Sequence, residues 1–177
     1  MRFCYFVILS FVFSSGLFAQ EKEVMMKKSE NNFFAPGRDK LYLSSDKEER
    51  YKKFTITRSR FDVETTINRI KQNLEERQIP VFALFDHGKN AREVGLDFRP
   101  TQVIVFGSPG VGTLLMQENQ LIALELPLKI AVWEDAEGKV WVGFLNMKNM
   151  ARKYGLEQNP ITDKMQLLLE DIVKKSI

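Results

Sequence analysis

Two residues suited to proton transfer, Asp86 and His87, stand side by side directly after the apolar run Val81–Phe85. His87 is the only histidine in the chain. An imidazole changes its charge near neutral pH, so it can serve as a general acid or base. Asp86 and His87 are therefore the candidate catalytic residues. The structural alternative is that Asp86 caps a short helix near Asn90 while His87 fills the turn.

A metal site on this histidine has little support from the sequence. Zinc normally takes three or four nitrogen or sulfur ligands, and only carboxylates are left to join His87. The one cysteine, Cys4, lies within the first 19 residues, so the remainder of the chain has no thiol. We expect no metal and no cofactor. With one histidine and no Gly-x-Ser-x-Gly motif, a serine or cysteine triad is also unsupported.

A glycine-rich turn, Gly107–Thr113, nearly matches a phosphate-binding loop. The lysine that such a loop places on the phosphates is missing, and Pro109 removes a backbone donor that the cradle would need. A simpler binding site for an anion or a carboxylate at this turn is an alternative. Its ligand-binding candidates are Ser108, Gly110, Val111 and Gly112. Alternatively, the glycines only let the backbone pass close to a neighbouring segment.

Lys129 is a further ligand-binding candidate, because it follows Leu128 inside an apolar strand. A partly buried ammonium group can act as a nucleophile or as the counter-ion of a ligand. The alternative is that its stem covers apolar surface while its charge reaches water. Trp133 and Trp141 should meet across a hairpin, where we expect them in the core or in a dimer face, with a ligand wall as the secondary alternative.

The N-terminus has the layout of a secretory signal. Arg2 precedes an apolar run that reaches Phe13, and Ala19 stands just before Gln20. The run is shorter than the roughly 20 residues that a membrane-spanning helix needs. We therefore expect residues 1–19 to be removed, the mature protein to be exported to the periplasm or the medium, and no stable insertion into the membrane.

Residues 20–50 form a charged segment that we expect to be a linker or an arm, because no apolar period runs through it. Fourteen of its 31 residues are charged. Removing Arg2 leaves 25 basic residues against 23 acidic ones, and the two signs are interspersed. This balance, together with export, argues against nucleic-acid binding.

Residues 51–177 are expected to form one α+β domain with a mainly antiparallel sheet. Phe54 and Ile56 alternate with polar residues, as in a half-buried strand. Asp62 is placed to cap a helix with one apolar stripe. The run Val81–Phe85 is apolar throughout, which predicts a strand covered on both faces.

The later elements are also indicated by local signals. The expected elements are a short helix Asn90–Val94 closed by Gly95, a strand Thr101–Phe106, a helix from Ser108–Pro109 to about Asn119, a hairpin joining Leu128–Trp133 to Val140–Phe144, and a final helix from Thr162 or Asp163.

The chain resembles domain-of-unknown-function family 302 of bacteria over about Tyr51–Tyr154. The resemblance is carried by FDH, RPTQVIVFG, VGT and LELPLKIAVWED, in this order and at matching spacing. It implies the strand, helix, four strands, helix order of a TATA-binding-protein-like fold, without DNA binding. It also implies a homodimer and points to Asp86 and His87. The family usually has Asn and Lys where this chain has Ser108 and Gly110.

Three functions remain open at this point. The first is an exported, non-enzymatic binding or interaction module for a small ligand or a protein partner, with a pocket near His87. The second is a small enzyme, a hydrolase or isomerase, that uses Asp86 and His87 as an acid–base pair. The third is a structural accessory protein of the cell envelope. A pocket that holds His87 would favour the first two.

Overall fold

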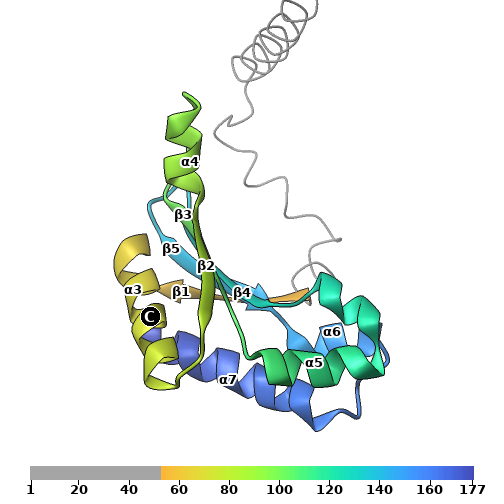
Figure 1. The fold of residues 1–177 in the computed structure, drawn as a ribbon. Coiled ribbons are helices and arrows are strands. Elements are labelled where there is room, and N and C mark those ends of the chain that lie inside the picture. The colour runs from red at the N-terminus through yellow and green to blue at the C-terminus, as the bar shows by residue number, and fades with distance from the viewer. Residues whose placement is uncertain (1–52) are drawn as a thin grey trace, which may run out of the picture. The chain divides into compact units, whose positions relative to one another are not determined.

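The computed structural model describes residues 53–177, so the expected signal (1–19) and arm (20–50) lie outside the described residues. The elements follow one another in the order shown in Figure 1: β1 (Phe54–Ser59), α3 (Val63–Glu76), β2 (Val81–Asp86), α4 (His87–Glu93), β3 (Thr101–Phe106), α5 (Pro109–Glu118), the 3-10 helix η2 (Gln120–Leu124), β4 (Leu128–Glu134), β5 (Val140–Leu145), α6 (Met147–Lys153) and α7 (Pro160–Ser176).

The five strands form one sheet in the order β1-β5-β4-β3-β2, and every neighbouring pair is antiparallel. The α+β class and the antiparallel sheet are thus confirmed. In Figure 1 the helices α3 and α7 lie side by side beneath one face of the sheet, while α4 extends from its end. Among residues 53–177, no helix is long and apolar enough to cross a bilayer.

Helix α3 forms as the sequence predicts. The Asp62 carboxylate accepts a hydrogen bond from the Thr65 backbone amide at 2.7 Å, which satisfies one of the free donors in the first turn. The apolar residues spaced three and four apart then fall on one buried face. These residues are Val63, Ile67, Ile70 and Leu74. The helix buries this face against β3, β4 and α7.

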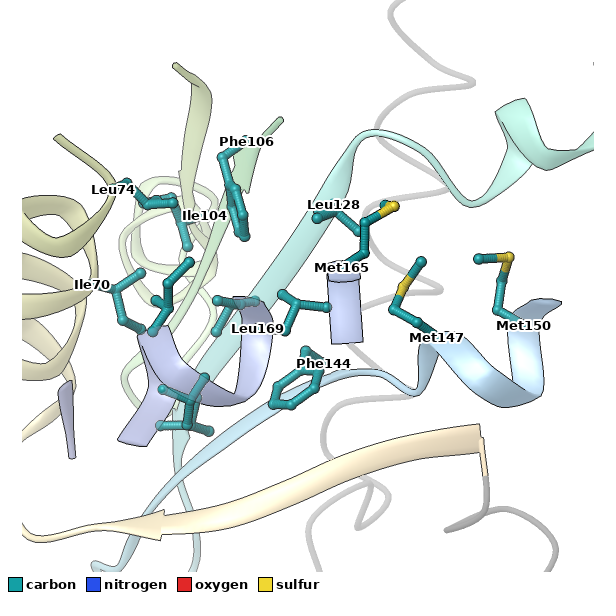
Figure 2. Packing of buried hydrophobic residues seen from close by; sticks show 14 of the residues in the cluster. Ile70, Leu74, Ile104, Phe106, Leu128, Phe144, Met147, Met150, Met165 and Leu169 are labelled. Carbon is teal, nitrogen blue, oxygen red and sulfur yellow. The ribbon is translucent and has the colours of Figure 1, made fainter. Parts of the chain in front are cut away.

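The core lies between this face of the sheet and the helices. Figure 2 shows Leu169 of α7 among side chains that come from α3 and from the strands. Ile104 of β3 and Ile130 of β4 are both fully buried there. Burying a side chain of this kind contributes about 1.5–3 kcal/mol, so this layer is a large source of hydrophobic stabilisation.

The prediction that Val81–Phe85 is covered on both faces is wrong. The strand β2 lies at the edge of the sheet and pairs with β3 alone among the described strands. Phe82 and Phe85 are each 49% exposed, and Leu84 is 43% exposed. An apolar run is equally compatible with a central strand and with an edge strand, because burial depends on neighbours that the run itself does not encode.

Some predicted boundaries also move. The helix after β2 begins at His87 rather than at Asn90. The last helix begins at Pro160, where the Asn159 side chain accepts from the Ile161 amide at 2.8 Å. The elements η2 and α6 were not predicted, because each is short and carries no strong apolar period. The hairpin, the strand β3 and the helix that begins after Ser108 are confirmed.

Candidate functional site

Asp86 is the N-cap of α4. Its carboxylate accepts hydrogen bonds from the Lys89 backbone amide at 2.8 Å and from the Gln102 side-chain amide at 3.3 Å. His87 is the first residue of the helix, and its side chain is exposed. The imidazole stacks on the ring of Phe85, with the ring centroids 6.5 Å apart. The pair therefore ends a strand and starts a helix.

Asp86 and His87 line neither of two cavities, of about 350 and 410 Å³, that residues 53–177 form. Within residues 53–177 there is also no group of three or more His, Cys, Asp or Glu residues arranged to hold a metal ion. An acid–base pair needs a substrate held within hydrogen-bonding reach. The catalytic role of Asp86 and His87 stays a prediction.

The glycine-rich turn instead forms one wall of a pocket of about 350 Å³. The other walls come from β2, from the segment η2–β4 and from α7. The side chains of Phe82, Met116 and Met165 are among those that line it. None of the lining residues is charged, and the polar side chains are the hydroxyls of Ser108 and Thr113. The pocket is thus suited to an apolar molecule rather than to an anion.

Local sequence explains the shape of this wall. Pro109 occupies the first turn of α5, where its missing N–H costs no hydrogen bond, and Ser108 is the N-cap residue. A Cβ atom at Gly107 would lie 3.6 Å from the ring of Phe82, and one at Gly112 would lie 3.7 Å from Leu126. A side chain at either position would therefore lie against the wall of the pocket.

The ligand-binding candidates from the sequence do not form one site. Ser108, Val111 and Gly112 line the pocket, whereas Gly110 does not. Lys129 lies elsewhere, in a groove of about 410 Å³ on the sheet. Its ammonium group is exposed and donates to the Glu125 carbonyl oxygen at 3.3 Å.

Most of the pocket's apolar walls were missed by sequence reasoning. Ile79, Phe82, Met116, Met165 and Leu168 line it but come from segments far apart in the chain. Each of them reads as an ordinary apolar position of a helix, strand or loop. The only local signal was the glycine-rich turn, because small residues mark a place where the backbone is approached closely.

Glu125 is the one acidic residue that lines the groove of Lys129. Its carboxylate accepts hydrogen bonds from the Tyr154 hydroxyl at 3.0 Å and from the Lys153 ammonium at 3.2 Å. Burial acts to raise the pKa of Glu125, but these two hydrogen bonds and nearby positive charges outweigh it, so that the pKa lies below its ordinary value. The carboxylate is therefore ionised and already paired.

Comparison with known proteins finds relatives of the domain and a similar solved fold. A crystal structure of an uncharacterized conserved protein DUF302 from Bacillus stearothermophilus superimposes with a TM-score of 0.60 and 20% identity, over 70% of this chain and 98% of that one. At this identity the likeness concerns the fold alone.

Two curated relatives are named fluoride-specific ion channel FluC 1. The proteins of Brucella suis biovar 1 (strain 1330) and Brucella abortus biovar 1 (strain 9-941) are each 40% identical to this chain over 98 residues, or 55% of it. The match covers 39% and 36% of their lengths, so this chain corresponds to less than half of either protein.

The family comparison covers most of the described domain. The model of the domain of unknown function DUF302 matches residues 54–172, from β1 into α7. The resemblance seen in the sequence motifs is thereby confirmed, and the chain belongs to the DUF302 family.

Proposed function

We propose that this domain is a binding module for a small, uncharged, apolar molecule, which it holds in the pocket between the glycine-rich turn and α7. One observation carries the proposal: about 350 Å³ of space is lined entirely by uncharged residues. Ligand pockets have volumes of about 300–1,000 Å³ and mostly apolar walls with few polar groups. The hydroxyls of Ser108 and Thr113 would then orient the ligand.

Two glycines of α5 provide a matched test. Gly112 lines the pocket, whereas Gly110 is exposed and has no atom within 4 Å of a Cβ built on it. Replacing either glycine by leucine raises helix propensity by a similar amount, roughly 1 kcal/mol. Only the leucine at position 112 would project into the cavity.

The experiment measures binding of the neutral fluorescent probe N-phenyl-1-naphthylamine to the full-length protein. Gly112→Leu should weaken binding of the probe by more than about tenfold, because the leucine side chain would occupy cavity volume that the probe otherwise fills. Gly110→Leu should bind like the parent. A thermal melt checks that both variants fold, and Ala123→Leu, on the pocket wall, serves as a second blocking variant. Equal binding by all variants would contradict the proposal.

We also propose that the protein acts outside the cytoplasm, as the layout of residues 1–19 suggests. An apolar ligand pocket is useful to an exported protein, because apolar molecules need a carrier in water. N-terminal sequencing of the protein from its host should give a start at or near Gln20. A full-length protein in the cytosolic fraction would contradict this part.

A homodimer through β2 is a further proposal, supported by the exposure of this strand. An edge strand with free backbone groups and apolar side chains is a template for another strand. Two copies of β2 related by a twofold axis would pair antiparallel and extend the sheet. Light scattering should give twice the chain mass for the parent, and Phe85→Lys, which puts a charge on the exposed edge, should give the monomer.

The acid–base role of Asp86 and His87 is the alternative function. It would require a substrate to bind over the exposed start of α4, outside the pocket at the glycine-rich turn. The discriminating observation is a pH–rate profile controlled by one imidazole group. A substrate turned over equally well by His87→Ala would exclude it.

A further inference from the structure

A second apolar cavity is lined by side chains of β1, β3, β4 and β5 together with the core residues Phe144 and Leu169. It is the groove of about 410 Å³ that Lys129 lines, and we call it the sheet groove. Its lining includes Ile56 of β1, Gly143 of β5, Ala131 of β4 and Val103 of β3. It shares only Leu128 with the pocket at the glycine-rich turn, so the two cavities have different walls.

The strand register explains why the floor of the sheet groove is low. Ile56 pairs with Gly143, Gly143 with Ala131, and Ala131 with Val103, so these residues form one row across four strands. The two central positions are the smallest residues of the row. The row spans roughly 14 Å, since neighbouring strands lie about 4.8 Å apart.

The flanking rows are bulkier and form the walls. On one side Phe54 pairs with Leu145, and on the other Trp133 pairs with Trp141. The indole of Trp133 lies over Gly143, because a Cβ atom there would be only 3.0 Å from the ring. Gly143 thus makes room for the indole, which covers the floor at this position and gives the groove an aromatic wall.

The charged groups around the groove are mostly basic. Lys53 and Lys129 line it, and Lys153 is paired with Glu125 at the same end. Glu125 is the only acidic lining residue, and its charge is already balanced by Lys153. Lys53 and Lys129 therefore leave an excess of positive charge beside an apolar groove.

We propose that the sheet groove binds the anion of a single-chain fatty acid, with its carboxylate at Lys53 and Lys129 and its hydrocarbon chain along the floor against Trp133. Charge complementarity selects an anion, and the apolar floor selects a hydrocarbon body. The floor offers no side-chain hydrogen-bonding group, and its central strands β5 and β4 are already paired on both sides, so an extended peptide would find no ladder of free backbone partners over them.

The test compares decanoate with decan-1-ol, which has the same chain and no charge. Both compete with 1-anilinonaphthalene-8-sulfonate for the full-length protein, at concentrations below micelle formation. The parent should bind decanoate more tightly than decan-1-ol. The double variant Lys53→Gln/Lys129→Gln should lose about tenfold in decanoate affinity and nothing for the alcohol.

Matched variants control for net charge and for folding. Lys139→Gln/Lys148→Gln removes the same charge from two exposed lysines outside the groove and should leave decanoate binding unchanged. Ala131→Leu fills the floor and should weaken decanoate binding by more than about tenfold, whereas Ala136→Leu, in the exposed hairpin turn, should not. The lysine variants alter only exposed side chains, so the charge test does not depend on whether Ala131→Leu folds.

Each other outcome would overturn the inference. Equal decanoate affinity for the two double-lysine variants would remove the charge argument, and parent-like binding by a folded Ala131→Leu would place the ligand elsewhere. Retention on phosphatidylglycerol vesicles without binding of free decanoate would identify a membrane surface instead. Loss of decanoate binding in Gly112→Leu would assign the ligand to the other pocket.

Discussion

The strands β2 and β3 are neighbours with similar sequences, yet their environments differ. Each has six residues and follows a proline, and each carries an apolar run. In the paired positions Leu84 and Ile104, however, Leu84 is 43% exposed while Ile104 is fully buried. The difference arises because β3 lies between two strands and above α3, whereas β2 has a partner on one side only. Burial is thus a property of position in the sheet rather than of the run.

The largest expected effect comes from shortening these two paired side chains. Ile104→Ala should destabilise the protein by about 3–4 kcal/mol, because it removes buried methyl groups and leaves a cavity. Leu84→Ala should cost about 1 kcal/mol or less, because much of its side chain already contacts water. Urea denaturation of both variants beside the parent measures the difference.

The same pair also tests whether the edge is free in solution. A loss of about 3 kcal/mol at Leu84 would mean that another chain covers β2, and the loss should then depend on protein concentration. If Ile104→Ala and Leu84→Ala both caused the same small loss in the free energy of unfolding, the burial of Ile104 in β3 would be contradicted.

The next effect concerns the helices that follow the two strands. Asp86 caps α4 with a hydrogen bond to the Lys89 amide, whereas Ser108 is the N-cap of α5 but makes no capping bond with its side chain. Asp86→Ala should therefore cost about 1 kcal/mol, and Ser108→Ala close to nothing. Thermal melts measure both, and equal losses would show that the Ser108 hydroxyl caps α5 in solution.

Local signals in the sequence were sufficient for most of the fold. The Asp62 cap with its apolar stripe, the Ser108–Pro109 helix start and the hairpin closed by Gly138 each depend on residues close together in the chain. Their physical causes are capping, fixed backbone angles and turn geometry, all of which are short-ranged. These signals also gave the order of the strands along the chain, which the family resemblance shares.

The candidate site could be predicted only in part. Ser108, Val111 and Gly112 were found through the glycine-rich turn, but Phe82 and Met165 line the same pocket from distant segments. The sheet groove depends on the register that places Gly143 beside Ala131. Contacts of this kind, between residues far apart in the chain, are determined by tertiary packing and cannot be inferred from any single segment. Residue type drew attention to His87, although it lines neither the pocket at the glycine-rich turn nor the sheet groove.

A smaller effect is expected at the exposed end of β2. His87 stacks on Phe85 at the surface, so His87→Ala should change the free energy of unfolding by about 0.5 kcal/mol or less. Binding of N-phenyl-1-naphthylamine should also be unchanged, because His87 does not line the pocket. A denaturant melt and a probe titration measure the two quantities. If His87→Ala clearly lost binding of the probe without losing stability, the result would support the sequence-based prediction of a pocket near His87.

The smallest effect is a pH dependence in the helix layer beneath β3. Asp171 of α7 accepts hydrogen bonds from Lys175 and from Arg77 of α3, and these lower the pKa of the carboxyl below its ordinary value of 3.8. A lowered pKa in the folded protein means that the ionised form is stabilised, so the contribution is present above about pH 4 and is lost as the pH falls through the lowered value. Asp171→Asn should therefore melt slightly below the parent at neutral pH, and the two melting curves should converge in acid. Because Asp171 and its two partners are partly exposed, high salt should also reduce the difference in melting temperature between the variant and the parent. A difference that grows as the pH falls would show that this carboxylate does not stabilise the contact between α3 and α7.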